Sequence, residues 1–209
     1  VAQGYKEVDD PSVTVRFPLA DRQEGEPEGT SFLVWTTTPW ALPSNAAVAV
    51  HPGVSYAHVR CGEETFILAA DLAAQVLAGH DFTVLKTEPG SALLGRKYRR
   101  PFSYLPAMGW VDEATQQEMV EEGRVLGAEF VTMEDGTGIV HMAPAYGADD
   151  LDACTKAGLP VVHGVGLDGC FLPEVTPVAG QFFKDADPIL MQELEERGLL
   201  FASGTYTHN

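Results

Sequence analysis

Three consecutive threonines between two tryptophans are the first residues in this chain that could carry chemistry. The segment Trp35-Thr36-Thr37-Thr38-Pro39-Trp40 stands at the end of an apolar run. Alternation along a strand places Thr36 and Thr38 on one face and Thr37 on the other, and each hydroxyl can donate and accept a hydrogen bond. Threonine also favours strands for packing reasons alone, and an indole can fill a core as well as line a ligand pocket. The segment therefore predicts either the polar wall of a small-ligand site or a structural strand end.

A second group of polar residues follows in Gly136-Thr137-Gly138-Ile139-Val140-His141, with Asp149 and Asp150 just downstream. The glycines allow a ligand to approach the backbone closely, although they would also suit a plain hairpin turn. His141 lies between a predicted strand and a predicted helix, so it is a candidate for polar recognition or proton transfer, with a hydrogen-bonded structural histidine as the alternative. One of the two aspartates could cap the helix, which leaves the other free to bind a cation such as a substrate ammonium group.

Other familiar chemistries have no motif in this chain. There is no Gly-x-Ser-x-Gly elbow, HExxH helix or P-loop, and Cys61, Cys154 and Cys170 form no CxxC pair. We therefore expect no metal, no cofactor and no disulfide framework, and free thiols fit a reducing cytoplasm. Any catalysis should use water and preorganised polar groups.

The composition is that of a folded, strongly acidic protein. Of 209 residues, 45% are hydrophobic and 21% are charged, which fits one domain over residues 1–209. The net charge of -17 repels phosphate, so any nucleic-acid partner must be held mainly by something else. No run approaches the roughly 18 apolar residues of a membrane span, and the chain starts without Met. We expect a piece of a longer protein with no membrane partner.

Short alternating segments and frequent turns predict a mainly β fold with a barrel-like or sandwich core and peripheral α-helices. A tight turn at residues 134–136 should join two of the strands in a hairpin. Three helices are expected at residues 71–77, from Asp149 or Asp150 to about 157, and at 185–197. The expected strands are residues 13–17, 31–38, 46–50, 56–60, 64–69, 82–86, 130–133, 138–142 and 161–165.

The two motifs, extended to residues 35–45 and 136–150, resemble the conserved blocks of the editing (CP1) domain inserted in isoleucyl-tRNA synthetases, a class I aminoacyl-tRNA synthetase family. Residues 15–18 and 94–98 also fit, so the resemblance covers nearly the whole chain in the expected order. Valyl and leucyl relatives share the fold but resemble Thr-Thr-Arg-Pro at the first block. Ala41 departs from the pattern, because many members have a threonine there.

The resemblance implies hydrolysis of valine wrongly attached to isoleucine tRNA, and also of valyl-adenylate, in a pocket that excludes isoleucine by size. It implies that Asp150 binds the substrate ammonium group and that His141 lies beside the amino-acid side chain. It also implies that Thr36, Thr37 and Thr38 hold the ester and terminal ribose, and that Asn45 supports binding of the terminal adenosine or water. The implied catalytic residues are Asp150, His141, Thr37 and Thr38. The implied substrate-binding residues are Trp35, Thr36, Thr37, Thr38, Trp40, Asn45, Gly138, His141 and Asp150.

The implied partners are the 3′ end of tRNA(Ile) carrying valine, valyl-adenylate and the remainder of a parent synthetase in the cytoplasm. The adenylate-forming signatures are absent, so the chain should not aminoacylate. Two other readings stay open: a non-catalytic module that binds the tRNA acceptor end or acts as a spacer, and an unrelated small-molecule hydrolase. Deacylation by the chain itself would separate the first of these from an editing enzyme.

Overall fold

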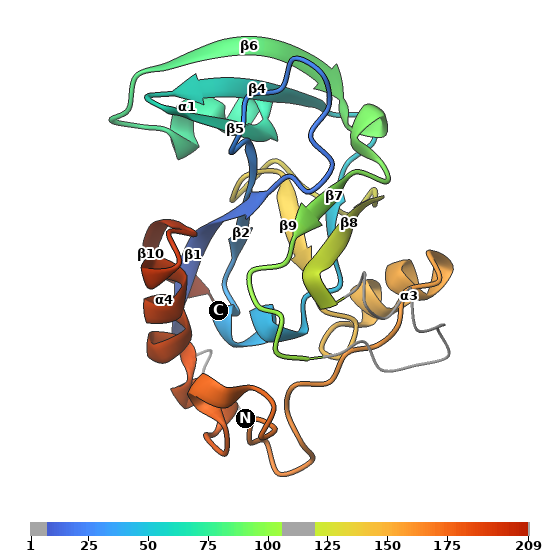
Figure 1. Ribbon diagram of the computed structural model, residues 1–209, viewed down its shortest axis with the longest axis vertical. Helices are drawn as coiled ribbons and strands as arrows, with labels where there is room; N and C mark the ends of the chain where they lie inside the picture. Colours follow the sequence, from blue (N-terminus) through green and yellow to red (C-terminus); the bar gives the residue numbers. More distant parts are fainter. Residues whose placement is uncertain (1–7, 106–119, 209) are drawn as a thin grey trace, which may run out of the picture.

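A single curled β-sheet dominates the computed structural model, which describes residues 8–105 and 120–208 (Figure 1). Within these residues the sheet has ten strands, in the order β6-β4-β5-β2-β9-β3-β8-β7, with β1 pairing both β2 and β10. The strands are β1 (Val8–Pro18), β2 (Ser31–Thr36), β3 (Ala47–Val50), β4 (Ser55–Cys61), β5 (Glu64–Ala69), β6 (Phe82–Pro89), β7 (Lys97–Arg99), β8 (Glu122–Gly127), β9 (Ile139–Met142) and β10 (Leu200–His208).

The sheet curls back on itself at its β7 end. Leu19, the residue after β1, forms an antiparallel bridge with Tyr98 of β7, and the Ala20 N–H donates to the Lys97 carbonyl at 3.0 Å. Because β1 also pairs with β2, the strands β1, β2, β9, β3, β8 and β7 enclose a common interior. Alternate residues of β1 fill it: Val13, Val15 and Phe17 are buried. The prediction of a mainly β, barrel-like core is confirmed.

The helices lie on the outside of the sheet, as expected. In Figure 1, α4 (Asp187–Glu196) runs beside β10 and β1, and α3 (Ala148–Lys156) lies on the opposite side of the molecule. Leu190 and Leu194 pack the inner face of α4 into the core. The short elements are α1 (Ala73–Val76) and the 3-10 turns η1 (Pro39–Ser44), η2 (Ala70–Leu72), η3 (Gly90–Leu93), η4 (Thr176–Val178) and η5 (Phe183–Asp185).

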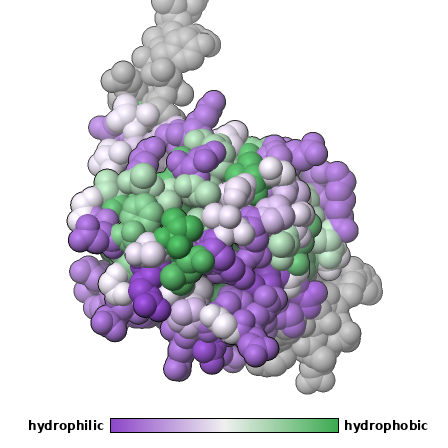
Figure 2. Space-filling view, turned by 90° about the horizontal axis from the view of Figure 1, so that it is seen from above, coloured by the Kyte–Doolittle hydropathy of each residue, from purple (hydrophilic) through white to green (hydrophobic). Residues whose placement is uncertain are grey.

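The strands β4, β5 and β6 form the upper part of the molecule in Figure 1, and β6 is the outer edge of the sheet. Val84 and Leu85 of β6 are exposed. The view from above in Figure 2 shows a small group of hydrophobic residues among hydrophilic ones on this face. No helix of the described residues is long and apolar enough to cross a membrane.

Three expectations about the elements are wrong. Residues 128–138 form an irregular loop, so the hairpin between 130–133 and 138–142 does not exist, and β9 pairs antiparallel with β3 and parallel with β2 instead. Residues 161–165 contribute only the bridge between Val165 and Phe171. The threonine strand ends at Thr36, because the proline at position 39 begins the turn η1.

Candidate functional site

The first motif and His141 meet at one cavity. It has a volume of about 390 Å³ and lies where the end of β2, the 128–138 loop and β9 come together. The parallel pairing of β2 with β9, which sets Trp35 opposite Val140, brings these distant segments side by side. The lining residues are Trp35, Thr36, Thr37, Thr38, Phe130, Val131, Thr132, Asp135, Val140 and His141. The structure therefore gathers five of the predicted site residues.

The threonines differ in what their hydroxyls do. Thr36 is buried, its Oγ1 accepts the Thr38 backbone N–H at 3.1 Å, and it lies 3.2 Å from the Thr38 Oγ1. This local bonding fixes the chain just after β2 ends. Thr37 lines the cavity, and within the described part of the chain its hydroxyl has no hydrogen-bond partner. Thr37 is thus the threonine whose hydroxyl is available to a ligand or to water.

His141 is a neutral, buried imidazole. The residue is only 7% exposed, and its Nδ1 lies 2.8 Å from the Asn45 Nδ2. Burial and the positive charge of Arg100 lower the pKa of His141 to about 3, and an interaction with the Ala41 backbone opposes this shift. Because an amide nitrogen only donates, Nδ1 must accept and the ring proton must sit on Nε2. Nε2 has no hydrogen-bond partner among the described residues.

Asn45 lies behind His141 and outside the cavity lining. The residue is fully buried, just before β3, and its Nδ2 donates both to His141 and to the Ala47 carbonyl at 3.0 Å. Its Oδ1 accepts from the Tyr98 hydroxyl. All of these contacts are with protein groups, so the geometry gives Asn45 a supporting position rather than a direct contact with a ligand in this cavity.

Asp150 is the third residue of α3, and its side chain accepts a hydrogen bond from the backbone of the preceding turn. The N-cap of the helix is Gly147, so neither aspartate fills that position. The Asp150 Oδ2 accepts the Ala143 N–H at 2.9 Å, which closes the turn between β9 and the helix two residues after His141. Burial raises the pKa of the Asp150 carboxyl, and the nearby charge of Asp149 adds to this. Asp150 does not line the 390 Å³ cavity, whereas the exposed Asp149 borders a separate one on α3.

Trp40 also lies outside the lining, although it follows the threonines directly. Its ring packs edge-on against Tyr146 and Phe183, with centroids 4.9 and 4.6 Å away. Its backbone N–H is hydrogen-bonded to Asp187 of α4. Trp40 therefore joins the threonine segment to the C-terminal part of the fold.

Gly138 has a packing role in the second motif. Its φ is +77°, and a Cβ there would stand 2.5 Å from the Ala69 Cβ. Its carbonyl accepts the Tyr56 hydroxyl at 2.6 Å. Only glycine combines this backbone conformation with this close approach, so Gly138 sets the start of β9 and does not line the cavity.

Four lining residues from the 128–138 loop were not predicted as site residues. Phe130, Val131 and Thr132 read as part of a strand, and Asp135 read as a turn residue. Asp135 contributes the one carboxylate of the lining. Within the described residues there is no cluster of three or more His, Cys, Asp or Glu that could hold a metal ion.

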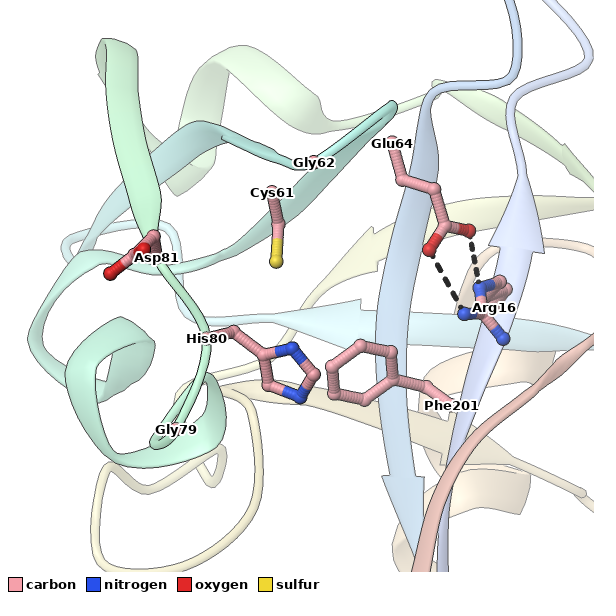
Figure 3. Close-up of a pocket in the computed structure, with 8 residues that line it drawn as sticks. All are labelled: Arg16, Cys61, Gly62, Glu64, Gly79, His80, Asp81 and Phe201. Atoms are coloured by element: carbon pink, nitrogen blue, oxygen red, sulfur yellow. Dashed lines mark hydrogen bonds and ion pairs between the residues drawn. The ribbon is translucent and has the colours of Figure 1, made fainter.

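A further cavity, of about 450 Å³, is lined by residues of β1, of the turn between β4 and β5, of the segment before β6 and of β10, and contains none of the predicted site residues (Figure 3). The guanidinium group of Arg16 already has protein partners. It donates to both carboxylate oxygens of Glu64, at 2.8 and 3.0 Å, and lies over the Phe201 ring. The lining residues are Arg16, Cys61, Gly62, Glu64, Gly79, His80, Asp81 and Phe201.

Comparison with known proteins gives consistent matches along the whole chain. The chain is 43% identical over 209 residues to the isoleucine–tRNA ligase of Thermus thermophilus, and the match covers 100% of this chain and 18% of that protein. The chain thus spans about a fifth of the length of the curated relatives it matches. No family model matches.

Two solved structures share the fold at low sequence identity. The structure titled GlLeuRS-CP1 superposes with a TM-score of 0.68 at 15% identity, over 92% of this chain and 99% of that one. The editing domain of the P. knowlesi cytosolic leucyl-tRNA synthetase gives a TM-score of 0.65 at 13% identity, over 95% and 97% of the two chains.

Proposed function

Because the chain belongs to the isoleucyl-tRNA synthetase family and has the fold of a CP1 editing domain, we propose that it hydrolyses the ester of valine wrongly attached to tRNA(Ile). The observation that carries the proposal is the cavity at which the threonine segment meets His141. Valyl-adenylate is a second substrate of the same proposal. The partners are then the 3′ end of the charged tRNA and the remainder of a parent synthetase in the cytoplasm.

The chemistry proposed is the orientation of water on an ester that is already activated. A neutral histidine with a pKa near 3 is a poor base at pH 7, and its Nε2–H is a hydrogen-bond donor. The Thr37 hydroxyl can both donate and accept, so it can hold a water molecule or the ester. With the neighbouring ribose hydroxyl assisting, precise placement then replaces a strong protein base or nucleophile.

Selectivity in this proposal comes from size. One methylene adds little attraction, so a first site distinguishes isoleucine from valine only weakly. A cavity sized for valine excludes the larger isoleucine by overpacking. His141, Val140 and Val131 are the lining residues that would contact an aliphatic side chain.

Asp150 keeps the role of binding the substrate ammonium group in this proposal. Its one described hydrogen bond uses Oδ2, and carboxylate oxygens can accept further donors. Partial burial would strengthen such a charge-assisted contact. Asp135, which lines the cavity, is the competing carboxylate for the same group.

The test is deacylation of Val-tRNA(Ile) by this chain at high protein concentration, with Ile-tRNA(Ile) as the second substrate. We expect the parent chain to release valine much faster than isoleucine. Asp150→Asn keeps an acceptor for the Ala143 N–H but removes the charge, and we expect it to abolish the activity; Asp149→Asn, on the same helical turn, is the matched control. A parent chain that leaves Val-tRNA(Ile) intact would favour the non-catalytic module. An active Asp150→Asn with an inactive Asp135→Asn would move the ammonium group to Asp135.

A further inference from the structure

An orphaned polar atom marks the wall of the proposed editing cavity. The Nε2 of His141 is buried and has no hydrogen-bond partner among the described residues, although the residue lines the cavity. A buried donor without an acceptor destabilises the folded state. His141 carries this unpaired donor although its other ring nitrogen, Nδ1, is hydrogen-bonded to Asn45.

The hydrogen bonds behind the ring determine which nitrogen carries the proton. The Ala47 carbonyl can only accept, so it requires the Asn45 Nδ2 on its side, and the Tyr98 hydroxyl then reaches Oδ1. With the amide oriented in this way, Nδ2 faces the His141 Nδ1 at 2.8 Å. The only neutral form of the ring that satisfies this contact carries its proton on Nε2.

The surroundings of Tyr98 keep its hydroxyl in place. The residue is fully buried and its ring packs against Phe17, with centroids 5.0 Å apart. Gly123, its cross-strand partner on β8, has no room for a Cβ, because that atom would collide with the Tyr98 ring and hydroxyl. Burial also raises the pKa of the Tyr98 hydroxyl, so it stays a donor throughout the physiological range.

We propose that Tyr98 and Asn45 are positioning residues that hold His141, in the wall of the cavity, as the neutral tautomer whose proton sits on Nε2. This inference rests on the proposed function and deepens it. In this form the ring offers a donor to an ester, ribose or water oxygen, and not to the ammonium group, which can only donate. The relay joins Tyr98 on β7, Asn45 two residues before β3, and His141 on β9, so it is built from three segments that lie far apart in the sequence.

The proposal assigns Asn45 a role other than contact with the terminal adenosine or water. It also excludes His141 as the general base, because Nδ1 is occupied by the Asn45 amide and Nε2 already carries a proton. A relay of this kind is a positioning device: it acts on the substrate only through His141.

The tautomer can be measured without reference to activity. Long-range ¹H–¹⁵N correlation spectra of the ¹⁵N-histidine-labelled chain, with His141 assigned through His141→Gln, distinguish Nε2–H from Nδ1–H. We expect His141 to remain neutral with its proton on Nε2 from pH 5 to pH 8. A parent chain that shows Nδ1–H, or an imidazolium in this range, would overturn the relay whatever its activity.

Two variants test the members of the relay. Asn45→Asp replaces the donor facing Nδ1 by an acceptor, and we expect the proton to move to Nδ1 and deacylation to fall on the order of 10²-fold. Tyr98→Phe removes the donor to Oδ1 and is the milder change if Asn45→Asp does not fold. We expect part of the protein to carry the His141 proton on Nδ1, and kcat to fall by a smaller fraction than the population of the Nε2–H tautomer. Tyr56→Phe, which removes another buried hydroxyl bonded to a carbonyl, is the control and should leave the tautomer unchanged.

The outcomes separate the relay from the proposed function. An Nε2–H tautomer that shifts in Asn45→Asp, in a parent chain that does not deacylate, would support the relay and refute the editing activity. A Tyr98→Phe chain with a single Nε2–H tautomer and the parental deacylation rate would remove Tyr98 from the relay. Deacylation at the parental rate by an Asn45→Asp chain with Nδ1–H would show that the donor on Nε2 is not needed.

Discussion

Asp187 is a half-buried acid whose removal should stabilise the protein at neutral pH. It opens α4, its Oδ1 is buried without a hydrogen-bond partner, and the carboxylate accepts the backbone N–H of Trp40. Burial, together with the charge of Asp10, raises its pKa from 3.8 to about 6. The folded protein therefore binds a proton at this site more tightly than the unfolded chain does.

The sign and size follow from this shift. Below the unfolded pKa of 3.8 both states are protonated. As the pH rises through about 6 the folded state must bury the charge, so the contribution of this group to stability is lost. A shift of about two units is worth at most about 3 kcal/mol, and partial exposure of the residue reduces this to roughly 1.5 kcal/mol. Asp187→Asn keeps an oxygen for the Trp40 N–H and avoids the charge. We expect it to be more stable by that amount at pH 7, a rise in Tm of about 3–6 °C.

The measurement is urea unfolding of parent and variant at pH 7 and pH 4.5. The gain in free energy of unfolding should be largest at pH 7 and clearly smaller at pH 4.5, where the folded parent carboxyl is protonated but the unfolded chain is still mostly ionised at this position. Asp185→Asn, an exposed acid two residues earlier, is the control and should change little at either pH. A variant that is less stable than the parent at pH 7, or a gain that does not depend on pH, would refute the reasoning.

Three further predictions concern packing, pH and tRNA binding. Gly138→Ala should lose roughly 2–4 kcal/mol in urea unfolding, because of its φ of +77° and the 2.5 Å approach to Ala69, whereas Gly158→Ala, with a φ of +72° in open space, should lose only about 1 kcal/mol. The rate of deacylation should show no ionisation of His141 between pH 5 and pH 8, since its pKa is about 3; a break in this range that disappears in His141→Gln would contradict this. The chain should bind tRNA weakly at physiological salt because of its net charge of -17, and a submicromolar Kd in a titration would be the opposite result.

The part of the fold that local sequence patterns predict best is the group of strands β4, β5 and β6. A tight turn joins β4 to β5, and a short helical segment joins β5 to β6, so alternation and turn residues carry the information, and the predicted ranges fall within the observed ones. The barrel closure depends on contacts between distant segments. Leu19 with Tyr98, and β9 between β2 and β3, have no local signal. The strand predicted at residues 130–133 does not form, because a residue such as Val131 is buried there without strand pairing.

The site likewise has one part that local motifs predict and another that depends on contacts between distant segments. The motif pattern predicted that the threonines and His141 lie together, and the cavity brings them together. The pattern could not show that the Asn45 amide is used up by Tyr98, Ala47 and His141, because these residues come from separate strands. Nor could it show that Trp40 packs against Tyr146 and Phe183, since both partners follow it by more than a hundred positions.

The geometry of His141 determines what kind of perturbation should matter most. A site that relies on a protein base fails when the base is protonated, so its rate follows pH. In this chain the proposed donor is neutral at all working pH values, and its direction depends on the Asn45 amide and on the room that Gly123 leaves for Tyr98. Errors of about 1 Å in such placement can cost on the order of 10²-fold in rate. We therefore expect the activity to tolerate changes in pH and to respond sharply to packing changes in β7, β8 and β3, at residues that never touch the substrate.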